Sequence, residues 1–278
     1  MLIKVIYKFG YSQVVFTKEV VKTFVSYKQI KKNQHESGGI LLGKVYKDLV
    51  LVDTVSEPSR EDKSGRYYFF RNVKKAQKII EDAWNNSQGE RIYLGEWHTH
   101  PEAMPTPSID DRKLLSNMLK DTRMEIEFLL MTIIGQSDNY VGVQQKGKKV
   151  IDPLSRVTST DGIEITIYKN ALEKISGFKV SGFINFAPTG YDIYNAALSQ
   201  IFTGAINSII SLTSINEYIL VMETGFIRFV IPNLKNEEER VHTLFNSMLI
   251  QIDMVVEEIR SKNFNQIIKY RFDASTIN

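Results

Sequence analysis

The sequence predicts an α/β protein in which a mixed sheet is flanked by helices and is followed by a second, α+β domain. The chain has 278 residues, 43% hydrophobic and 24% charged, a globular composition with ample apolar material for a core. Segments that alternate like strands are interleaved with segments of helical period, as expected for a sheet covered by helices. A joint rich in Ser, Thr and Asp spans residues 148–162, and the pattern restarts after it. We therefore expect domains over residues 1–152 and 160–278.

The first half carries helix-start signals at two polar residues. Thr17 and Asn72 each precede an apolar stripe of helical period, so each is predicted to cap a helix. In chain order we expect a hairpin over 1–16, a helix from 17 to about 33, strands over 37–46 and 49–56, a polar loop over 56–66, a strand over 66–70, a helix from 73 to near 89, a strand over 91–98, a helix from 108 to about 121, and strands over 125–135 and 139–145.

The second half repeats the mixture of strands and helices. We expect strands over 163–168 and 178–186, a helix from about 191 to 212, a hairpin over 217–231, a long helix from near 236, and a strand over 265–272. The 191–212 stretch is the longest apolar one, but it contains polar side chains that would be costly inside a bilayer. These are Asp192, Asn195, Gln200 and Asn207. We therefore predict a buried or interface helix.

Composition excludes several kinds of chemistry. The chain has no cysteine, which rules out disulfides, thiolate nucleophiles, Cys-ligated zinc and iron–sulfur clusters. A formal net charge of +3 is too small to indicate nucleic acid as a main partner. The N-terminal stretch alternates between apolar and polar residues, unlike a signal peptide. The expectation is a soluble, cytoplasmic protein without nucleic-acid or membrane partners.

The stretch YLGEWHTHPEAMPTPSIDD, residues 93–111, carries the strongest chemical signal. His98 and His100 stand two residues apart on a predicted strand, so both imidazoles project from one face, while Thr99 faces the other way and is predicted to be structural. Two histidines and a carboxylate form a common zinc ligand set, and Asp111 is the candidate third ligand. The alternatives are an incidental histidine pair and a capping box in which Ser108 and Asp111 merely start a helix. Their combination at this spacing favours a metal site.

A hydrolytic metal site also needs a base that is not a ligand. Glu36 is the candidate, predicted at the end of a helix just before Gly38 and Gly39, which allow the backbone to pass close to a neighbour. The alternative for Glu36 is a solvated carboxylate at a helix end.

Together, HESGGILLG and GEWHTHPEAMPTPSIDD resemble the JAMM signature of the JAB/MPN metalloproteases: a Glu, then His-x-His-Pro, then Ser-x-x-Asp. Residues 1–152 match every element of the signature, including the seven residues between His100 and Ser108. The sequence around these motifs resembles that of bacterial JAB peptidases found beside ubiquitin-activating-like and ubiquitin-conjugating-like enzymes in antiviral defence operons. The resemblance implies the JAB/MPN fold, a mixed sheet like that of cytidine deaminases, for this half only. Residues 160–278 lie outside it.

The resemblance also implies roles. His98, His100 and Asp111 would hold one Zn²⁺ per chain, Glu36 would act as general base and acid, and Ser108 would donate a hydrogen bond to the oxyanion. The implied partner is a ubiquitin-like protein or its conjugate. Two alternative functions stay open: a non-catalytic scaffold and a zinc amidohydrolase with another substrate. The polar loop 56–66 could clamp the substrate's extended tail, as the resemblance implies, or could be a solvated loop. The second domain is predicted to dock a substrate or partner, or to form a homodimer.

Overall fold

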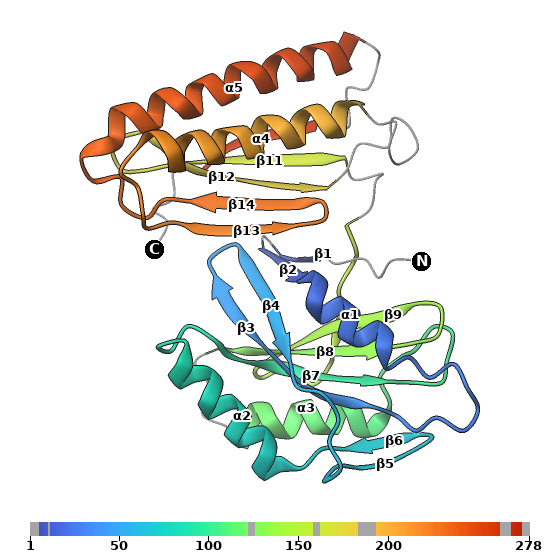
Figure 1. Ribbon diagram of the computed structural model, residues 1–278. Helices are drawn as coiled ribbons and strands as arrows, with labels where there is room; N and C mark the ends of the chain where they lie inside the picture. The colour runs from blue at the N-terminus through green and yellow to red at the C-terminus, as the bar shows by residue number, and fades with distance from the viewer. Residues whose placement is uncertain are drawn as a thin grey trace. The chain divides into compact units, whose positions relative to one another are not determined.

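The computed structural model describes residues 6–10, 12–121, 126–157, 162–182, 193–261 and 268–273. The chain forms two compact units, Met1–Arg156 and Val157–Asn278 (Figure 1). The division lies between the two limits expected from the sequence, residues 152 and 160.

The first unit is built on an eight-stranded mixed sheet. Its strands are β1 (Ile6–Phe9), β2 (Ser12–Phe16), β3 (Gly38–Tyr46), β4 (Leu49–Val55), β7 (Ile92–Thr99), β8 (Phe128–Ile134), β9 (Asn139–Gln145) and β10 (Asp152–Pro153), in the order β1-β2-β4-β3-β7-β8-β9-β10. The β2–β4 and β7–β8 pairs are parallel and the others antiparallel. The Lys8 N–H donates to the Ser155 carbonyl at 2.7 Å, so the first strand meets the segment after the last and the sheet curls on itself.

Helices cover both faces of this sheet (Figure 1). On one face, α1 (Lys18–Ser26) packs Val20 and Phe24 into a cluster with Leu41 and Trp97. On the other face, α2 (Val73–Asn86) and α3 (Ile109–Asp121) pack into a cluster that contains Ile40. Neighbouring residues of one strand thus enter opposite cores, as a strand requires. Each fully buried apolar side chain contributes roughly 1.5–3 kcal/mol. The predicted sheet flanked by helices is confirmed.

The predicted caps are confirmed, but one helix is shorter than expected. Thr17 Oγ1 accepts from the Val20 N–H at 3.5 Å, and Asn72 Oδ1 accepts from the Lys75 N–H at 3.0 Å. The first helix ends at Ser26 and not near residue 33, so the prediction that Glu36 ends a helix is wrong. After Ser26 the chain leaves the helix, with Ile30 63% exposed, because the buried Gln29 amide bonds Arg66 and Thr99. The predicted polar loop 56–66 is also partly wrong, because β5 (Lys63–Gly65) pairs with β6 (Tyr68–Phe70) as a hairpin.

The second unit is the α+β unit that the sequence predicts. Its strands are β11 (Ile163–Lys169), β12 (Ile175–Gly182), β13 (Ile219–Glu223), β14 (Phe226–Val230) and β15 (Ile268–Asp273), in the order β13-β14-β12-β11-β15. The helices α4 (Ile193–Leu212) and α5 (Glu238–Ser261) pack against one face and enclose a core that includes Phe178, Phe202 and Phe245. A 3-10 turn, Lys235–Glu237, precedes α5, which therefore starts slightly later than predicted. Residues 183–186 of the predicted strand and residues 191–192 of the predicted helix lie outside the described residues.

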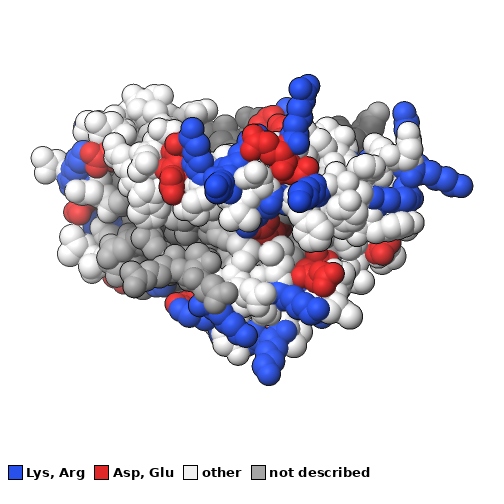
Figure 2. All heavy atoms as spheres, turned by 90° about the horizontal axis from the view of Figure 1, so that it is seen from below, with Lys and Arg blue, Asp and Glu red and all other residues white. Residues whose placement is uncertain are grey.

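The length of the helices and the distribution of surface charge are relevant to membrane and nucleic-acid binding. Within the described ranges, no helix combines the length and apolarity that crossing a bilayer requires. On the face drawn in Figure 2, basic side chains are interspersed with acidic and uncharged ones.

Candidate metal centre

His98 lies in β7 near its carboxyl end, and His100 directly follows the last residue of that strand. His98 is paired with Gly38 of β3 and with Ile133 of β8, so the strand that carries it lies in the middle of the sheet. The Nε2 atoms of His98 and His100 are 3.0 Å apart, and both side chains are buried. The prediction that the two imidazoles share a face is confirmed by this distance.

Asp111 completes a three-membered cluster from the first turn of α3. Its Oδ1 lies 3.3 Å from His98 Nε2, and its Oδ2 lies 3.9 Å from His100 Nε2. Ligands at about 2.0–2.2 Å from a tetrahedral ion stand roughly 3.3–3.6 Å from one another, and the His98–Asp111 Oδ1 separation falls in this range while the other two are slightly shorter or longer. The donor atoms all lie within 4.8 Å of one another. The residues are therefore a candidate site for a metal.

Ser108 performs the helix-capping role that was the alternative to a catalytic one. Its backbone N–H and its hydroxyl both donate to Asp111 Oδ2 at 2.7 Å, and its Oγ accepts from the Asp111 N–H at 3.1 Å. The cap occupies Oδ2 and leaves Oδ1 directed at His98. Capping therefore orients the carboxylate toward the histidines, so the same side chain starts the helix and takes part in the cluster.

Glu36 reaches the cluster from the irregular loop between α1 and β3. Its Oε1 lies 3.9 Å from His100 Nε2, and only 5% of the residue is exposed. Burial raises the pKa of this carboxyl to about 7; His98 opposes the rise, and Asp111 and Glu102 add to it. A carboxyl that exchanges its proton near neutral pH suits a general base. Glu36 lies outside the cluster formed by His98, His100 and Asp111.

The electrostatics of the cluster favour the protonation states that bind a metal. Burial would raise the pKa of Asp111, but hydrogen bonds from His98 and Ser108 outweigh it and hold that pKa well below its usual value. Burial and the neighbouring His98 lower the pKa of His100. A carboxylate and a neutral imidazole are the forms that coordinate metals.

Close packing explains the glycines after Glu36. A Cβ on Gly38 would lie 2.6 Å from the Trp97 carbonyl oxygen and 2.9 Å from the His98 Cβ. A Cβ on Gly39 would lie 2.3 Å from the Ser56 carbonyl oxygen. A side chain at residue 38 would push β3 away from the strand that carries His98, and one at residue 39 would push it away from Ser56, which follows β4.

Two features near the cluster have no counterpart in the sequence reasoning. Glu102 Oε2 lies 3.7 Å from His100 Nδ1, the ring nitrogen that faces away from the cluster. A carboxylate at that nitrogen orients a metal-binding imidazole. The position of Glu102, two residues after His100, could have indicated this contact from the sequence. The second feature is a buried ion pair two residues before His98, where Arg71 Nε donates to Glu96 at 2.9 Å and Tyr93 OH donates to it at 2.6 Å. This pair joins the end of the β5–β6 hairpin to β7.

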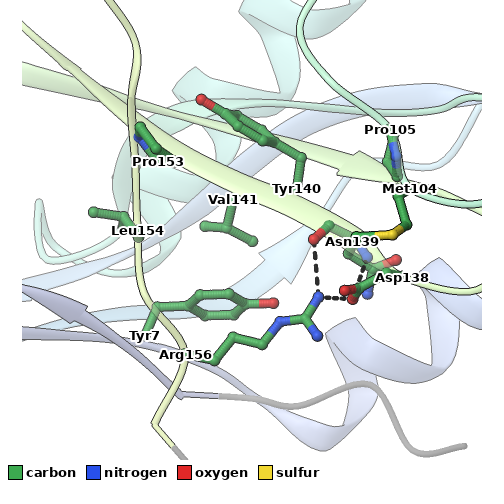
Figure 3. Close-up of a pocket in the computed structure, with 10 residues that line it drawn as sticks. All are labelled: Tyr7, Met104, Pro105, Asp138, Asn139, Tyr140, Val141, Pro153, Leu154 and Arg156. Carbon is green, nitrogen blue, oxygen red and sulfur yellow. Dashed lines mark hydrogen bonds and ion pairs between the residues drawn. The ribbon is translucent and has the colours of Figure 1, made fainter.

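A cavity of about 310 Å³ lies between β1, β9 and β10 (Figure 3). Met104 and Pro105, from the loop between His100 and Ser108, form one wall of it. On the same side, Arg156 pairs with Asp138 and donates to the Asn139 carbonyl at 2.9 Å. None of the residues predicted for the site is among its described lining, so the cavity is separate from the metal cluster.

The two units match two different families. The family described as prokaryotic homologs of the JAB domain matches residues 18–146, and the family described as cysteine protease Prp matches residues 162–264. The solved structure of the ribosomal processing protease Prp from S. aureus with a covalently linked product peptide is 23% identical, with a TM-score of 0.35, over 40% of this chain and 99% of that one. Protein DSY2949 from Desulfitobacterium hafniense is 20% identical, with a TM-score of 0.37, over 51% of this chain and 90% of that one. Because this chain has no cysteine, residues 162–264 cannot supply a thiol nucleophile.

Curated relatives match the first unit. The CD-NTase/cGAS isopeptidase of Escherichia coli (strain TW11681) is 35% identical over 135 residues, which cover 49% of this chain and 84% of the relative. The protein of that description from Vibrio cholerae is 33% identical over 147 residues, 52% of this chain and 90% of the relative. The one from Pseudomonas aeruginosa is 36% identical over 126 residues, 45% of this chain and 79% of the relative. With most of each relative matched at this identity, the chain belongs to the bacterial JAB/MPN peptidase family.

Proposed function

We propose that the chain is a zinc-dependent isopeptidase or peptidase that cuts at the C-terminal tail of a ubiquitin-like modifier. It would mature a precursor or reverse a conjugation in a bacterial defence system. One observation carries the proposal: His98, His100 and Asp111 converge within 4.8 Å, and Glu36 approaches His100 at 3.9 Å. The relatives' description as CD-NTase/cGAS isopeptidases supports the reaction class and a ubiquitin-like conjugate as substrate.

The assigned roles follow from the donor types. Two imidazoles and one carboxylate are a typical catalytic zinc set, and zinc, when bound, lowers the pKa of a coordinated water and polarises the scissile carbonyl. Glu36 accepts a proton from the attacking water and passes it to the leaving amine, which is a lysine Nζ in an isopeptide bond. The Ser108 hydroxyl turns from Asp111 Oδ2 and donates to the carbonyl oxygen as that oxygen gains negative charge. Removing such a donor typically costs about 2.7–4 kcal/mol.

The β5–β6 hairpin is the element that we assign to the modifier's tail. An extended peptide can pair with the edge strand of a hairpin through backbone hydrogen bonds, and neighbouring pockets then hold its side chains. Tyr67, Tyr68 and Phe70 are 74%, 48% and 61% exposed on this hairpin and offer apolar contacts. The Gly65 carbonyl accepts from the Glu36 N–H at 2.7 Å, so the hairpin adjoins the assigned base.

A substrate panel tests the proposal. The full chain, loaded with zinc, is incubated with ubiquitin and bacterial ubiquitin-like modifiers, each as a linear fusion to a fluorescent protein and as a lysine conjugate. We expect cleavage directly after the last residue of at least one modifier, identified by mass spectrometry. Intact fusions and conjugates alongside cleavage of a small-molecule amide would favour the amidohydrolase alternative. A purified protein that holds no zinc and cuts nothing would favour the scaffold.

For the second unit we propose that it docks a substrate or partner without hydrolysing it. We also propose that two copies of the chain associate through α5. Ile250 and Met254 stand one turn apart on this helix and are 63% and 67% exposed. Burying such a pair against a second copy is favourable by roughly 25 cal/mol per Å² of apolar surface. We expect the full chain to be a dimer by light scattering and the double variant Ile250→Glu, Met254→Lys to be a monomer. The neighbouring polar change Gln251→Glu should leave the dimer intact, and a wild-type protein that is monomeric at all concentrations would contradict the prediction.

A further inference from the structure

We propose that Gln29 and Thr99 are positioning residues that hold the base loop, residues 34–37, in register with the metal-ligand strand and the hairpin turn. The proposal rests on the base role proposed for Glu36, and it concerns what keeps that carboxylate in place. Neither residue touches the metal cluster through its side chain. They lie far apart in the sequence and meet on the face of β7 opposite the histidines.

Gln29 is a buried amide that bonds three separate segments. The residue is 1% exposed, and its Oε1 accepts from the Thr99 hydroxyl at 3.1 Å. Its Nε2 donates to the Gln34 carbonyl at 3.2 Å and to the Arg66 carbonyl at 3.1 Å. Both donors and the acceptor of the amide are therefore used. The partners belong to the ligand strand, the base loop and the turn of the β5–β6 hairpin.

Thr99 joins the base loop to the ligand strand from its place between the two histidines. Its hydroxyl donates to Gln29 and accepts from the Ser37 N–H at 3.0 Å. Its backbone N–H donates to the Ser37 carbonyl at 2.8 Å. The residue that follows Glu36 is thus held on both its polar backbone groups by the residue that separates His98 from His100.

These bonds replace the ladder hydrogen bonds that regular structure would supply. Residues 27–37 form neither helix nor strand, and within this segment the buried residues are Gln29 and Glu36, so the base loop is held by bonds to other segments. The Glu36 N–H itself donates to Gly65 of the hairpin at 2.7 Å. The loop that carries the base is therefore held from the hairpin side and from the ligand-strand side.

Positioning matters because the carboxylate acts at a distance set by its backbone. Glu36 Oε1 stands 3.9 Å from His100 Nε2, and a shift of the loop moves the carboxylate with it. A misplacement of about 1 Å can reduce a rate by about 100-fold even when every reacting group is present. Loss of the Thr99 hydroxyl should therefore lower kcat without removing the metal ligands or the bond from Gln29 to the substrate-binding hairpin.

The test uses variants that differ by single polar groups in the full chain. Thr99→Val is nearly isosteric and removes the hydroxyl, Thr99→Ser retains it, and Gln29→Met removes the amide at similar length. Gln77→Met, on the exposed surface of α2, is the matched control for the last variant. The readouts are zinc content, the melting temperature, kcat and KM on the modifier fusion cut fastest by the wild type, and amide hydrogen exchange of the base loop.

We expect Thr99→Val to lower kcat by about 10–100-fold, with KM within about twofold and one zinc retained. Thr99→Ser should restore kcat to within about threefold of wild type, the rescue that a hydroxyl-specific role requires. The Ser37 amide should exchange faster in Thr99→Val and Gln29→Met, but not in Thr99→Ser or Gln77→Met. Unchanged exchange in Thr99→Val, a loss confined to KM, or no rescue by serine would overturn the proposal. If the wild type cuts no substrate, the proposed function fails, and the exchange readout alone still decides the positioning role.

Discussion

Glu36→Gln is expected to reduce kcat for modifier cleavage by about 10²–10⁴-fold, the usual contribution of a general base. The amide has nearly the shape of the carboxylate but cannot accept the proton of the attacking water. Because Glu36 is not one of the three proposed zinc ligands, one zinc per chain should remain bound. Initial rates on a fusion substrate and metal analysis of the same sample measure both quantities.

The control for this variant is Glu81→Gln, which makes the same chemical change on the exposed surface of α2. It should retain the wild-type rate. Undiminished turnover by Glu36→Gln would remove the base assignment. Loss of zinc from Glu36→Gln would instead make Glu36 a structural contributor to the metal site.

Removal of the metal is expected to abolish cleavage, whereas thiol reagents should have no effect. The chain matches a JAB family and a cysteine protease family, and these predict opposite inhibitor responses. A chelator such as 1,10-phenanthroline removes the Lewis acid, which accounts for several kcal/mol of transition-state stabilisation. Iodoacetamide finds no cysteine to alkylate. Rates after each treatment, and after zinc is restored to the chelated sample, give the comparison.

Ligand variants connect this result to the cluster. His98→Ala and Asp111→Asn should each lower zinc content and activity together, and added zinc should restore activity only to the chelated wild type. The buried, paired geometry of these side chains makes any single loss costly, because a three-ligand site has no spare donor. Full activity in protein shown to be free of metal would contradict the zinc proposal.

Much of the fold follows from local patterns in the sequence. The short apolar runs of β3, β7 and β8 and the capping residues Thr17 and Asn72 are local properties, so they identify elements without knowledge of their neighbours. The end of α1 was not predictable in this way. The polar run after Ser26 suits an exposed helix as well as a loop, and the buried amide of Gln29 decides for the loop through distant contacts to Arg66 and Thr99.

For the candidate site, the sequence by itself determined which residue types are available: two histidines in alternation, a carboxylate three residues after a serine, and a chain without thiols. Their catalytic and metal-binding roles stay predictions. Only the tertiary structure decided that Asp111 meets His98 at 3.3 Å, that Glu36 arrives from a loop, and that Glu102 faces the outer nitrogen of His100. The physical reason is that spacing along a strand or helix sets the direction of neighbouring side chains, whereas contacts between segments depend on how the whole sheet curls and packs.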